Sequence, residues 1–223
     1  MCLQKGHNFC ADLGNDHSGW SRQFPLRKPK GFDQSWDYFK KIVTAESAGN
    51  LQEARNILTL DDGNLRQSWF IDHAQNAGEW RHKAFNIDPP EPVMPLDSVK
   101  KFDKFLESIL SRDNFRCRYC SQTVFSKKKL QVMRNSLGDE YFRIGKTNRT
   151  RNGYYLTLCA TLDHVLPHSL GGRTNPDNLV TSCWPCNYGK MNWTLDQIGL
   201  ESPFLREPLP RELLVEELMA PKS

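Results

Sequence analysis

Four of the seven cysteines lie in two Cys-x-x-Cys pairs, Cys117/Cys120 and Cys183/Cys186. Two residues between paired cysteines allow both thiolates to turn toward one ion, and two such pairs complete the tetrahedral set typical of structural zinc. The odd cysteine count and the paired spacing do not favour a disulfide framework. The spacing therefore predicts a structural Zn²⁺ that holds together a motif with little core of its own. The alternative is a redox-active Cys-x-x-Cys, which needs only one pair.

A group of polar residues lies between the two pairs and directly after the second. Asp163 and His164 are adjacent, and Asn187 follows the last cysteine. Histidine, with an unperturbed pKa of about 6.5, suits removal of a proton from water, and oxygen ligands suit Mg²⁺. Adjacent strand residues point to opposite faces, so one can face a metal and the other a water where the strand bends or ends. These residue types suit phosphodiester hydrolysis, in which negative charge builds on the phosphoryl oxygens.

The order of these residues resembles that of the HNH endonucleases over about residues 97–200. The matching pattern is Asp163-His164-x-x-Pro-x-x-x-Gly-Gly, then Asn178-Leu-Val, then Cys183-x-x-Cys186-Asn187-x-x-Lys190. The resemblance implies an α+β fold with a ββα-metal core interleaved with the four-cysteine zinc site. It also implies Mg²⁺ or Mn²⁺ as a second, catalytic cofactor.

The resemblance further implies a role for each polar residue of the motif. His164 would be the general base that activates water. Asp163 and Asn187 would bind the catalytic divalent metal, with Asn187 at a position where many members of the family have histidine. Asn178 would orient the loop that carries the base.

Three basic residues in or beside the motif are candidates for contacts to phosphate, because positive charge near a phosphodiester adds affinity and stabilises the transition state. They are His168, Arg173 and Lys190. For His168, a loop position or a part in metal binding or proton transfer is the alternative. For Arg173 and Lys190, the alternative is an exposed surface charge.

A separate basic stretch lies in a long insertion, residues 121–153, between the first cysteine pair and Asp163. Residues 126–151 hold 8 basic and 2 acidic side chains, a net charge of +6, whereas the whole chain has +4. The stretch begins with Lys127, Lys128 and Lys129. Such a concentration indicates a polyanionic partner and predicts contacts to the nucleic-acid backbone, although an ordinary solvated face is the alternative.

Three elements must position the candidate site. A strand rich in β-formers is predicted over Tyr154–Asp163 and would deliver His164. A second strand is predicted over Leu179–Ser182, and a helix from about Pro185 to Trp193 would place Asn187 and Lys190 on one face.

The rest of the chain divides into segments with different patterns. Residues 1–32 read as irregular, and residues 33–86 as a helical domain whose first helix is capped by Asp33. Residues 87–96 contain four prolines and read as a linker. The nuclease domain spans 97–200 and opens with a helix capped by Asp97. Residues 201–223 form a tail with a short helix from Pro210.

Together these features predict a metal-dependent DNA endonuclease with duplex DNA as partner. The sequence leaves the choice between a monomer and a homodimer undecided. Enzymes of this kind often serve restriction, phage defence or genome mobility. The chain has no long apolar run or secretory signal, so a cytoplasmic protein of bacterial or phage origin without a membrane partner is expected. Activity is expected to rise between about pH 6 and 8 as His164 deprotonates. The alternatives are a non-catalytic zinc-dependent nucleic-acid binding module and an HNH nuclease acting on RNA or single strands.

Overall fold

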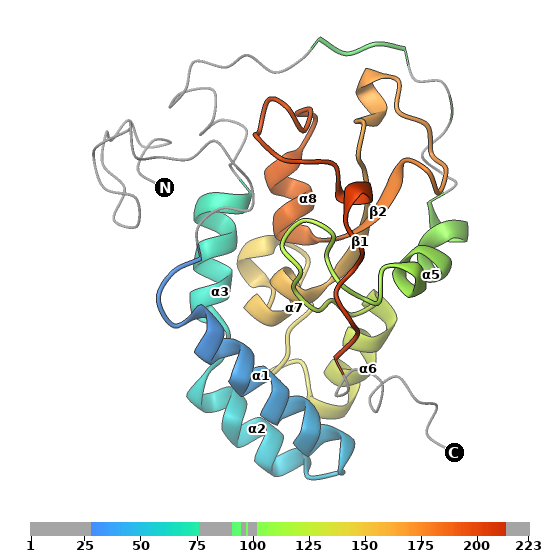
Figure 1. Ribbon diagram of the computed structural model, residues 1–223. Helices are drawn as coiled ribbons and strands as arrows, with labels where there is room; N and C mark the ends of the chain where they lie inside the picture. Colours follow the sequence, from blue (N-terminus) through green and yellow to red (C-terminus); the bar gives the residue numbers. More distant parts are fainter. Residues whose placement is uncertain (1–27, 76–90, 95–96, 98–101, 213–223) are drawn as a thin grey trace, which may run out of the picture.

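The computed structural model describes residues 28–75, 91–94, 97 and 102–212 (Figure 1). The expectations for residues 1–27, for most of the proline-rich linker and for the chain beyond 212 lie outside these residues. The described chain combines helices with a two-stranded sheet, as the α+β prediction requires.

Three helices form the described N-terminal region. They are α1 (Phe32–Ser47), α2 (Leu51–Leu60) and α3 (Asn64–Trp69), the last continued by a π-helical turn. The prediction of a mainly helical region is confirmed for these residues. The predicted cap of α1 is wrong, because Gly31 occupies the N-cap with a φ of 89° and Asp33 lies in the first turn. A glycine adopts this left-handed conformation without a steric penalty, and an acidic first turn still favours the helix dipole.

The aromatic side chains of α1 pack against residues far along the chain. The ring of Phe39 lies 4.8 Å from that of Tyr154 and 5.6 Å from that of Phe125, measured between centroids. All three side chains are fully or almost fully buried and belong to one apolar cluster. The helical region and the sheet region therefore share a core. The boundaries 33–86 and 97–200 mark different patterns along the chain and stay predictions.

The sheet is an antiparallel pair of β1 (Ala160–His164) and β2 (Leu179–Cys183), and α8 (Trp184–Lys190) follows β2 directly. Ala160 pairs with Cys183 and His164 with Leu179, so β1 ends at the base candidate where β2 begins. Figure 1 shows α8 beside the two strands, with α5 on their other side. The second predicted strand and the predicted helix are confirmed to within a few residues.

The first predicted strand is correct only from Ala160 onward. Residues Gly153–Leu158 form the helix α7, in which all six residues are buried. The Asn152 side chain caps α7 by accepting from the N–H of Tyr154 at 2.8 Å. A Cβ atom at Gly153 would lie 1.9 Å from the carbonyl oxygen of Gly63, so only glycine allows α7 to start this close to α3. Capping and burial outweigh the strand preference of the Tyr and Thr side chains.

Two further helices flank the sheet region. Helix α5 (Asp103–Arg112) begins six residues after Asp97, so Asp97 is not its cap as predicted. The carboxylate of Asp97 instead accepts from the N–H of Thr174 and contacts His168. Helix α6 (Lys127–Leu137) lies in the basic insertion and is capped by Ser126, which accepts from the N–H of Lys129.

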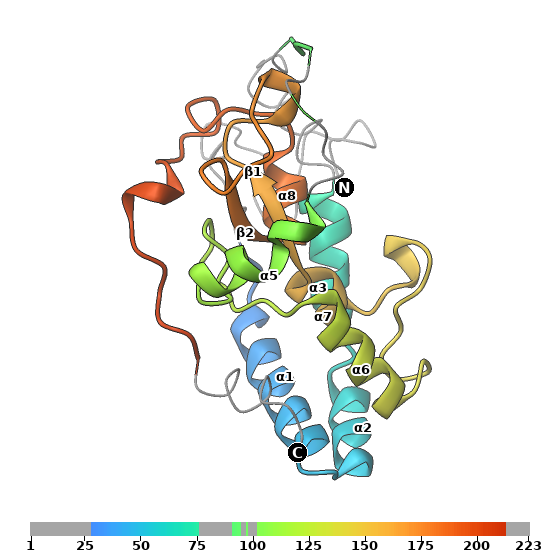
Figure 2. The ribbon, with the colours of Figure 1, turned by 90° about the vertical axis from the view of Figure 1, so that its right-hand side faces the viewer.

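The segment Pro203–Glu212, which we call the C-terminal strap, crosses the first cysteine pair. Arg116 Nε donates to the carbonyl of Pro210 at 3.0 Å, and Arg118 Nη2 donates to the carbonyls of Pro203 and Arg206. Figure 2 shows the strap as an extended red segment along one edge of the molecule. The predicted helix does not start at Pro210, since residues 210–212 are not helical and both Pro210 and Glu212 accept from Arg116. The rest of that predicted helix lies outside the described residues.

Candidate functional site

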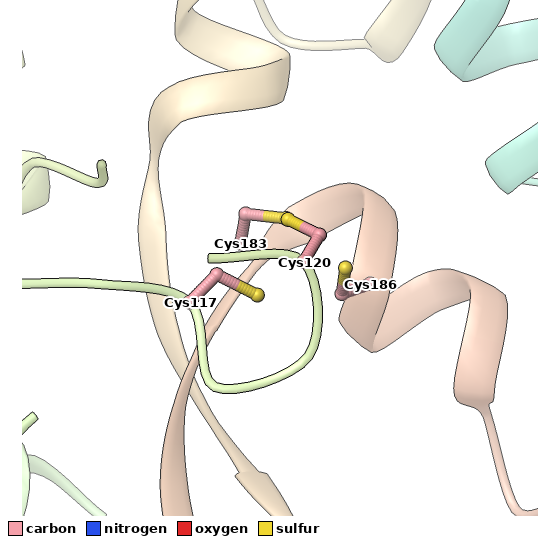
Figure 3. Close-up of side chains that lie close together, drawn as sticks. All are labelled: Cys117, Cys120, Cys183 and Cys186. Carbon is pink, nitrogen blue, oxygen red and sulfur yellow. The ribbon is translucent and has the colours of Figure 1, made fainter. Parts of the chain in front are cut away.

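The four paired cysteines converge from three parts of the chain. Their sulfur atoms all lie within 4.8 Å of one another, and the Sγ atoms of Cys120 and Cys183 are 3.8 Å apart (Figure 3). All four are free thiols, and three of them are buried. Four sulfur donors at this spacing can hold a tetrahedral zinc ion with no open position for substrate. This convergence favours the metal site over a redox pair.

A cavity of about 490 Å³ lies beside the end of β1. Polar side chains of the motif line one part of it, and apolar side chains from α5 and α8 line another. The lining residues that matter here are Asp163, His164, His168, Asn187, Lys127 and Phe102. The cavity therefore brings together side chains from five separate parts of the chain.

His164 ends β1 and is only 7% exposed. Its Nε2 atom lies 3.0 Å from the hydroxyl of Thr174, and the ring of Phe102 packs edge-on at 4.9 Å. Burial, followed by the nearby charges of His168 and Lys190, lowers the pKa of His164 to about 4. The imidazole is therefore neutral at pH 7 and has one nitrogen free of a proton.

This pKa corrects the expected rise in activity between pH 6 and 8. Protonation of His164 removes the neutral form only below about pH 5. We expect kcat/KM, which reports the free enzyme, to be flat from pH 6 to 8 and to fall as the pH drops through about 4. The measurement is kcat/KM for cleavage against pH, with His168→Gln as the control that removes the second imidazole. A tenfold rise between pH 6 and 7 in both proteins would contradict this expectation.

The carboxylate of Asp163 is held through one of its oxygens. Oδ2 accepts a hydrogen bond from the hydroxyl of Tyr119 at 2.6 Å and an ion-pair contact from Lys190 Nζ at 3.2 Å. Burial raises the pKa of Asp163, and the ammonium of Lys190 opposes that shift. Among the described residues, none donates a hydrogen bond to Oδ1, so this oxygen remains available to a ligand in the cavity.

The ammonium of Lys190, a predicted phosphate contact, has its partners inside the protein. Its side chain is 0% exposed, and Nζ donates to the carbonyl oxygen of His164 at 2.7 Å as well as facing Asp163. A buried ammonium with two oxygen partners is occupied inside the protein. Lys190 thus braces the end of β1, and Asn187 of the same helix also donates to a carbonyl of this strand.

The two asparagines of the motif have different surroundings. The Asn187 side chain donates from Nδ2 to the carbonyl of Leu162 at 3.0 Å, which turns its amide toward β1. Asn178 accepts from the N–H of Leu166 at 2.8 Å and donates to the carbonyls of Leu166 and Arg173. Asn178 therefore clamps the two ends of the loop that follows His164.

Comparison with known families bears on this arrangement. Residues 157–200, which contain β1, the clamped loop, β2 and α8, match the family model described as HNH endonuclease. The chain contains an HNH endonuclease domain. No curated protein and no solved structure matches the chain significantly. Within the described residues, every helix is too short or too polar to traverse a lipid bilayer.

Of the remaining predicted phosphate contacts, some line the cavity and others do not. His168 lines the cavity with its ring 5.3 Å from that of His164, whereas Arg173 is exposed on the loop and does not line it. Lys127 lines the cavity from the start of α6, and its neighbours Lys128 and Lys129 lie on the same first turn. The structure thus brings His168 and Lys127 to the cavity.

Three residues of the HNH domain's surroundings were missed by the sequence analysis. Tyr119 lies inside the first cysteine pair and reaches Asp163, Thr174 reaches His164, and Asp97 reaches Thr174 and His168. Tyrosine and threonine occur at many buried positions in proteins, and no repeating spacing links Tyr119 or Thr174 to the motif. Their residue types alone therefore do not mark them as site residues. Only the position of Tyr119 between Cys117 and Cys120 offered a signal, since it ties that side chain to the four-cysteine cluster.

Proposed function

We propose that the chain is a metal-dependent endonuclease that hydrolyses phosphodiester bonds in DNA, with His164 as the general base. One observation carries the proposal. The cavity holds the neutral imidazole of His164 at the end of β1, next to the buried carboxylate of Asp163 and the amide of Asn187. Oδ1 of Asp163 and the amide oxygen of Asn187 accept no hydrogen bond from any described residue. A binding module without catalysis has no need of this combination.

We further propose that β1, β2 and α8 form the ββα-metal unit of this nuclease. The two strands and the helix follow one another directly, and α8 begins at the cysteine pair that closes the zinc centre. In this arrangement the zinc fixes the junction of strand and helix.

The donor set of the cavity fits a divalent cation. Oδ1 of Asp163 and the amide oxygen of Asn187 would hold Mg²⁺ or Mn²⁺, which keep several waters and need few protein ligands. The cation supplies neutralisation of the negative charge that develops on the phosphate. The Asn187 amide is a weaker ligand than histidine, and Lys190 shares the Asp163 carboxylate, so we expect weak cation binding.

The protein's own residues account for the proton transfers. His164 takes a proton from a water, and the electron pair left on the water oxygen forms the new bond to phosphorus. The bond from phosphorus to the leaving oxygen breaks, and that oxygen takes a proton from solvent. Lys190 keeps the end of β1 in place through the His164 carbonyl, and Asn178 keeps the following loop in place.

We assign the first turn of α6 to the DNA backbone. Lys127 lines the cavity that holds His164, and Lys128 is exposed next to it. The positive end of a helix and adjacent lysines both attract phosphate. Backbone contacts of this kind position a nucleic acid without reading its sequence.

Changing Lys127, Lys128 and Lys129 to Gln is expected to weaken DNA binding and to reduce its salt dependence. Each phosphate contact contributes about 0.9 to the slope of log K against log salt concentration on duplex DNA. The measurement is fluorescence anisotropy with labelled duplex DNA from about 50 to 200 mM salt. A variant with Lys28, Lys30 and Lys104 changed to Gln removes equal charge outside both the insertion and the helical region, and serves as control. An unchanged slope of log K against log salt concentration in the first variant would mean that these three lysines form an ordinary solvated face.

The proposed activity is tested by incubating purified protein with supercoiled plasmid and Mg²⁺, Mn²⁺ or EDTA. Nicking or linearisation that depends on the cation supports the proposal. Parallel reactions with single-stranded DNA and RNA decide the substrate, and preference for either would replace duplex DNA. Binding of all substrates without cleavage would favour the non-catalytic module.

We propose that residues 33–86 serve recognition, dimerisation or regulation. One HNH domain cuts one strand, so linear product formed without a nicked intermediate would indicate a dimer. Successive nicking would indicate a monomer acting twice. Sedimentation of the active protein together with this time course distinguishes the two.

A further inference from the structure

The cavity beside β1 extends beyond the polar residues of the HNH motif. Its lining includes His164 and Asp163 at one end of the strand and Ala160 at the other. Four residue steps separate Ala160 from His164, a length of about 13 Å in a β-strand. In the proposed function the scissile phosphate lies at the His164 end, next to Asp163 and Asn187. The Ala160 end can therefore hold a further part of the strand that is cut.

Trp184 and Lys127 line the Ala160 end of the cavity from two different helices. Trp184 begins α8 directly after Cys183, which pairs with Ala160 in the sheet. Lys127 begins α6, two residues after Phe125, whose carbonyl oxygen accepts from the N–H of Ala160 at 2.8 Å. The Lys127 side chain is exposed and that of Trp184 is half-buried. A cation and an aromatic ring thus lie together at this end of the cavity.

The indole of Trp184 is held in place by neighbouring side chains. The ring of Tyr155 packs edge-on with its centroid 5.4 Å away, and that of Tyr188 lies at 6.3 Å. The guanidinium carbon of Arg151 lies 5.2 Å from the indole centroid. An aromatic side chain that is already ordered loses little conformational entropy when a ligand binds to it. An ordered indole at the wall of a cavity is a surface on which a nucleobase of any type can stack.

We infer that Trp184 stacks on a nucleobase of the strand that is cut, and that Lys127 binds a phosphate of the same strand next to that base. This inference rests on the proposed function, which places the scissile phosphate beside His164. Successive nucleotides of a stacked strand rise about 3.4 Å, so about 13 Å corresponds to about four nucleotides, and to fewer in an extended strand. The neighbouring ring and ammonium match the alternation of base and phosphate along a nucleic acid.

Stacking on Trp184 has a consequence for the substrate. A base can reach the indole only after it has left the stack of its own strand. This step costs free energy in a fully paired duplex and least for a base that is mismatched or already unpaired. We therefore expect the preferred substrate to be DNA with unpaired nucleotides close to the cut.

The first test separates base contacts from phosphate contacts. It uses the full-length, zinc-loaded His164→Ala protein, which lacks the proposed general base and leaves its ligands intact. Binding is measured by fluorescence anisotropy with a short single-stranded oligonucleotide and with an abasic strand of the same length, which has the same phosphates but no bases. We expect Trp184→Leu, added to this protein, to weaken binding of the first strand by about 5- to 150-fold and to leave binding of the abasic strand little changed.

Three further variants complete this comparison. Trp184→Phe keeps an aromatic ring and should retain most of the affinity. Lys127→Gln should weaken binding of both strands equally, because both have phosphates. Tyr188→Leu is the matched control, since Tyr188 is an exposed aromatic residue of the same helix that does not line the cavity formed by the described residues. Equal effects of Trp184→Leu on the two strands, or the same loss in Tyr188→Leu, would overturn the inference.

Melting curves and zinc content identify a variant that fails to fold. If Trp184→Leu does not fold, the difference in tryptophan fluorescence between the protein with Trp184 and Trp184→Phe decides instead. We expect the strand with bases to quench this difference signal and the abasic strand to leave it unchanged. Absence of quenching by the strand with bases would overturn the inference.

Cleavage gives the last readout. The wild type with Mg²⁺ or Mn²⁺ is expected to cut a duplex that contains a short unpaired segment faster than a fully paired duplex of the same length, and Trp184→Leu should lose this preference. Equal rates on the two duplexes by the wild type would overturn the inference. If neither duplex is cut, the nuclease proposal fails, and the comparison of the two strands still decides whether Trp184 holds a base.

Discussion

Replacing His164 with alanine is expected to lower the cleavage rate by about 10²- to 10⁴-fold, the usual contribution of a general base. The side chain is the neutral imidazole at the end of β1 next to Asp163, and alanine removes the group that we propose takes the proton from water. The variant should still fold, because the backbone of β1 and the bond from Lys190 to the carbonyl of residue 164 are retained.

The measurement is the initial rate of plasmid nicking under saturating cation. Asn192→Ala serves as matched control, because Asn192 is exposed, lines the same cavity and has no proposed chemical role. DNA affinity, zinc content and the melting curve of His164→Ala should match those of the wild type. A rate within tenfold of the wild type, which corresponds to less than about 1.4 kcal/mol, would mean that another group is the base.

Changing Cys117 or Cys186 to serine is expected to release zinc and unfold the HNH domain. Zinc binding to structural sites of this kind contributes about 10–16 kcal/mol at pH 7, which equals or exceeds the stability of most domains, about 5–15 kcal/mol. Cys117 lies on the loop after α5, and Cys186 lies in α8, so the ion joins distant parts of the chain. Loss of activity should follow, because α8 presents Asn187 and Lys190 to β1.

Zinc per chain is measured by metal analysis, and unfolding by circular dichroism with and without chelator. Cys159→Ala is the matched control, because Cys159 is a buried thiol that does not belong to the four-sulfur cluster. It should keep one zinc and melt close to the wild type. A Cys117→Ser protein with full zinc and normal melting would exclude the four-sulfur site.

The four-cysteine cluster and the order of the sheet and helix could be predicted from the cysteine spacing and the motif order. Two residues between cysteines favour convergence on one ion, and the β-rich run ending in Asp163-His164 predicts a strand that the structure has from Ala160 onward. Helix α7 could not be predicted in this way. Its sequence favours a strand, and the helix is stabilised by burial against α3 and by the closeness of Gly153 to Gly63.

Burial accounts for the main corrections within the site. Lys190 looks like a surface cation in the sequence, but the structure encloses it between the His164 carbonyl and Asp163. The pKa of His164 falls for the same reason, since enclosure disfavours the charged imidazole. Asp97 contacts Thr174 across 77 positions of chain, a separation that no local pattern encodes.

The C-terminal strap has a consequence for the order in which the chain becomes functional during synthesis. Arg116 and its carbonyl partner at Pro210 are separated by 94 positions, and the second cysteine pair also follows the first by more than 60. A ribosome makes the chain from its N-terminus, so the first cysteine pair emerges well before its partners. Until the strap has left the exit tunnel, Arg116 lacks the Pro210 acceptor, and Tyr119 is positioned without the Arg206 bond to its carbonyl. The helices α1 and α2 can form during this interval, while the loop that carries the first cysteine pair gains its contacts to the strap only later.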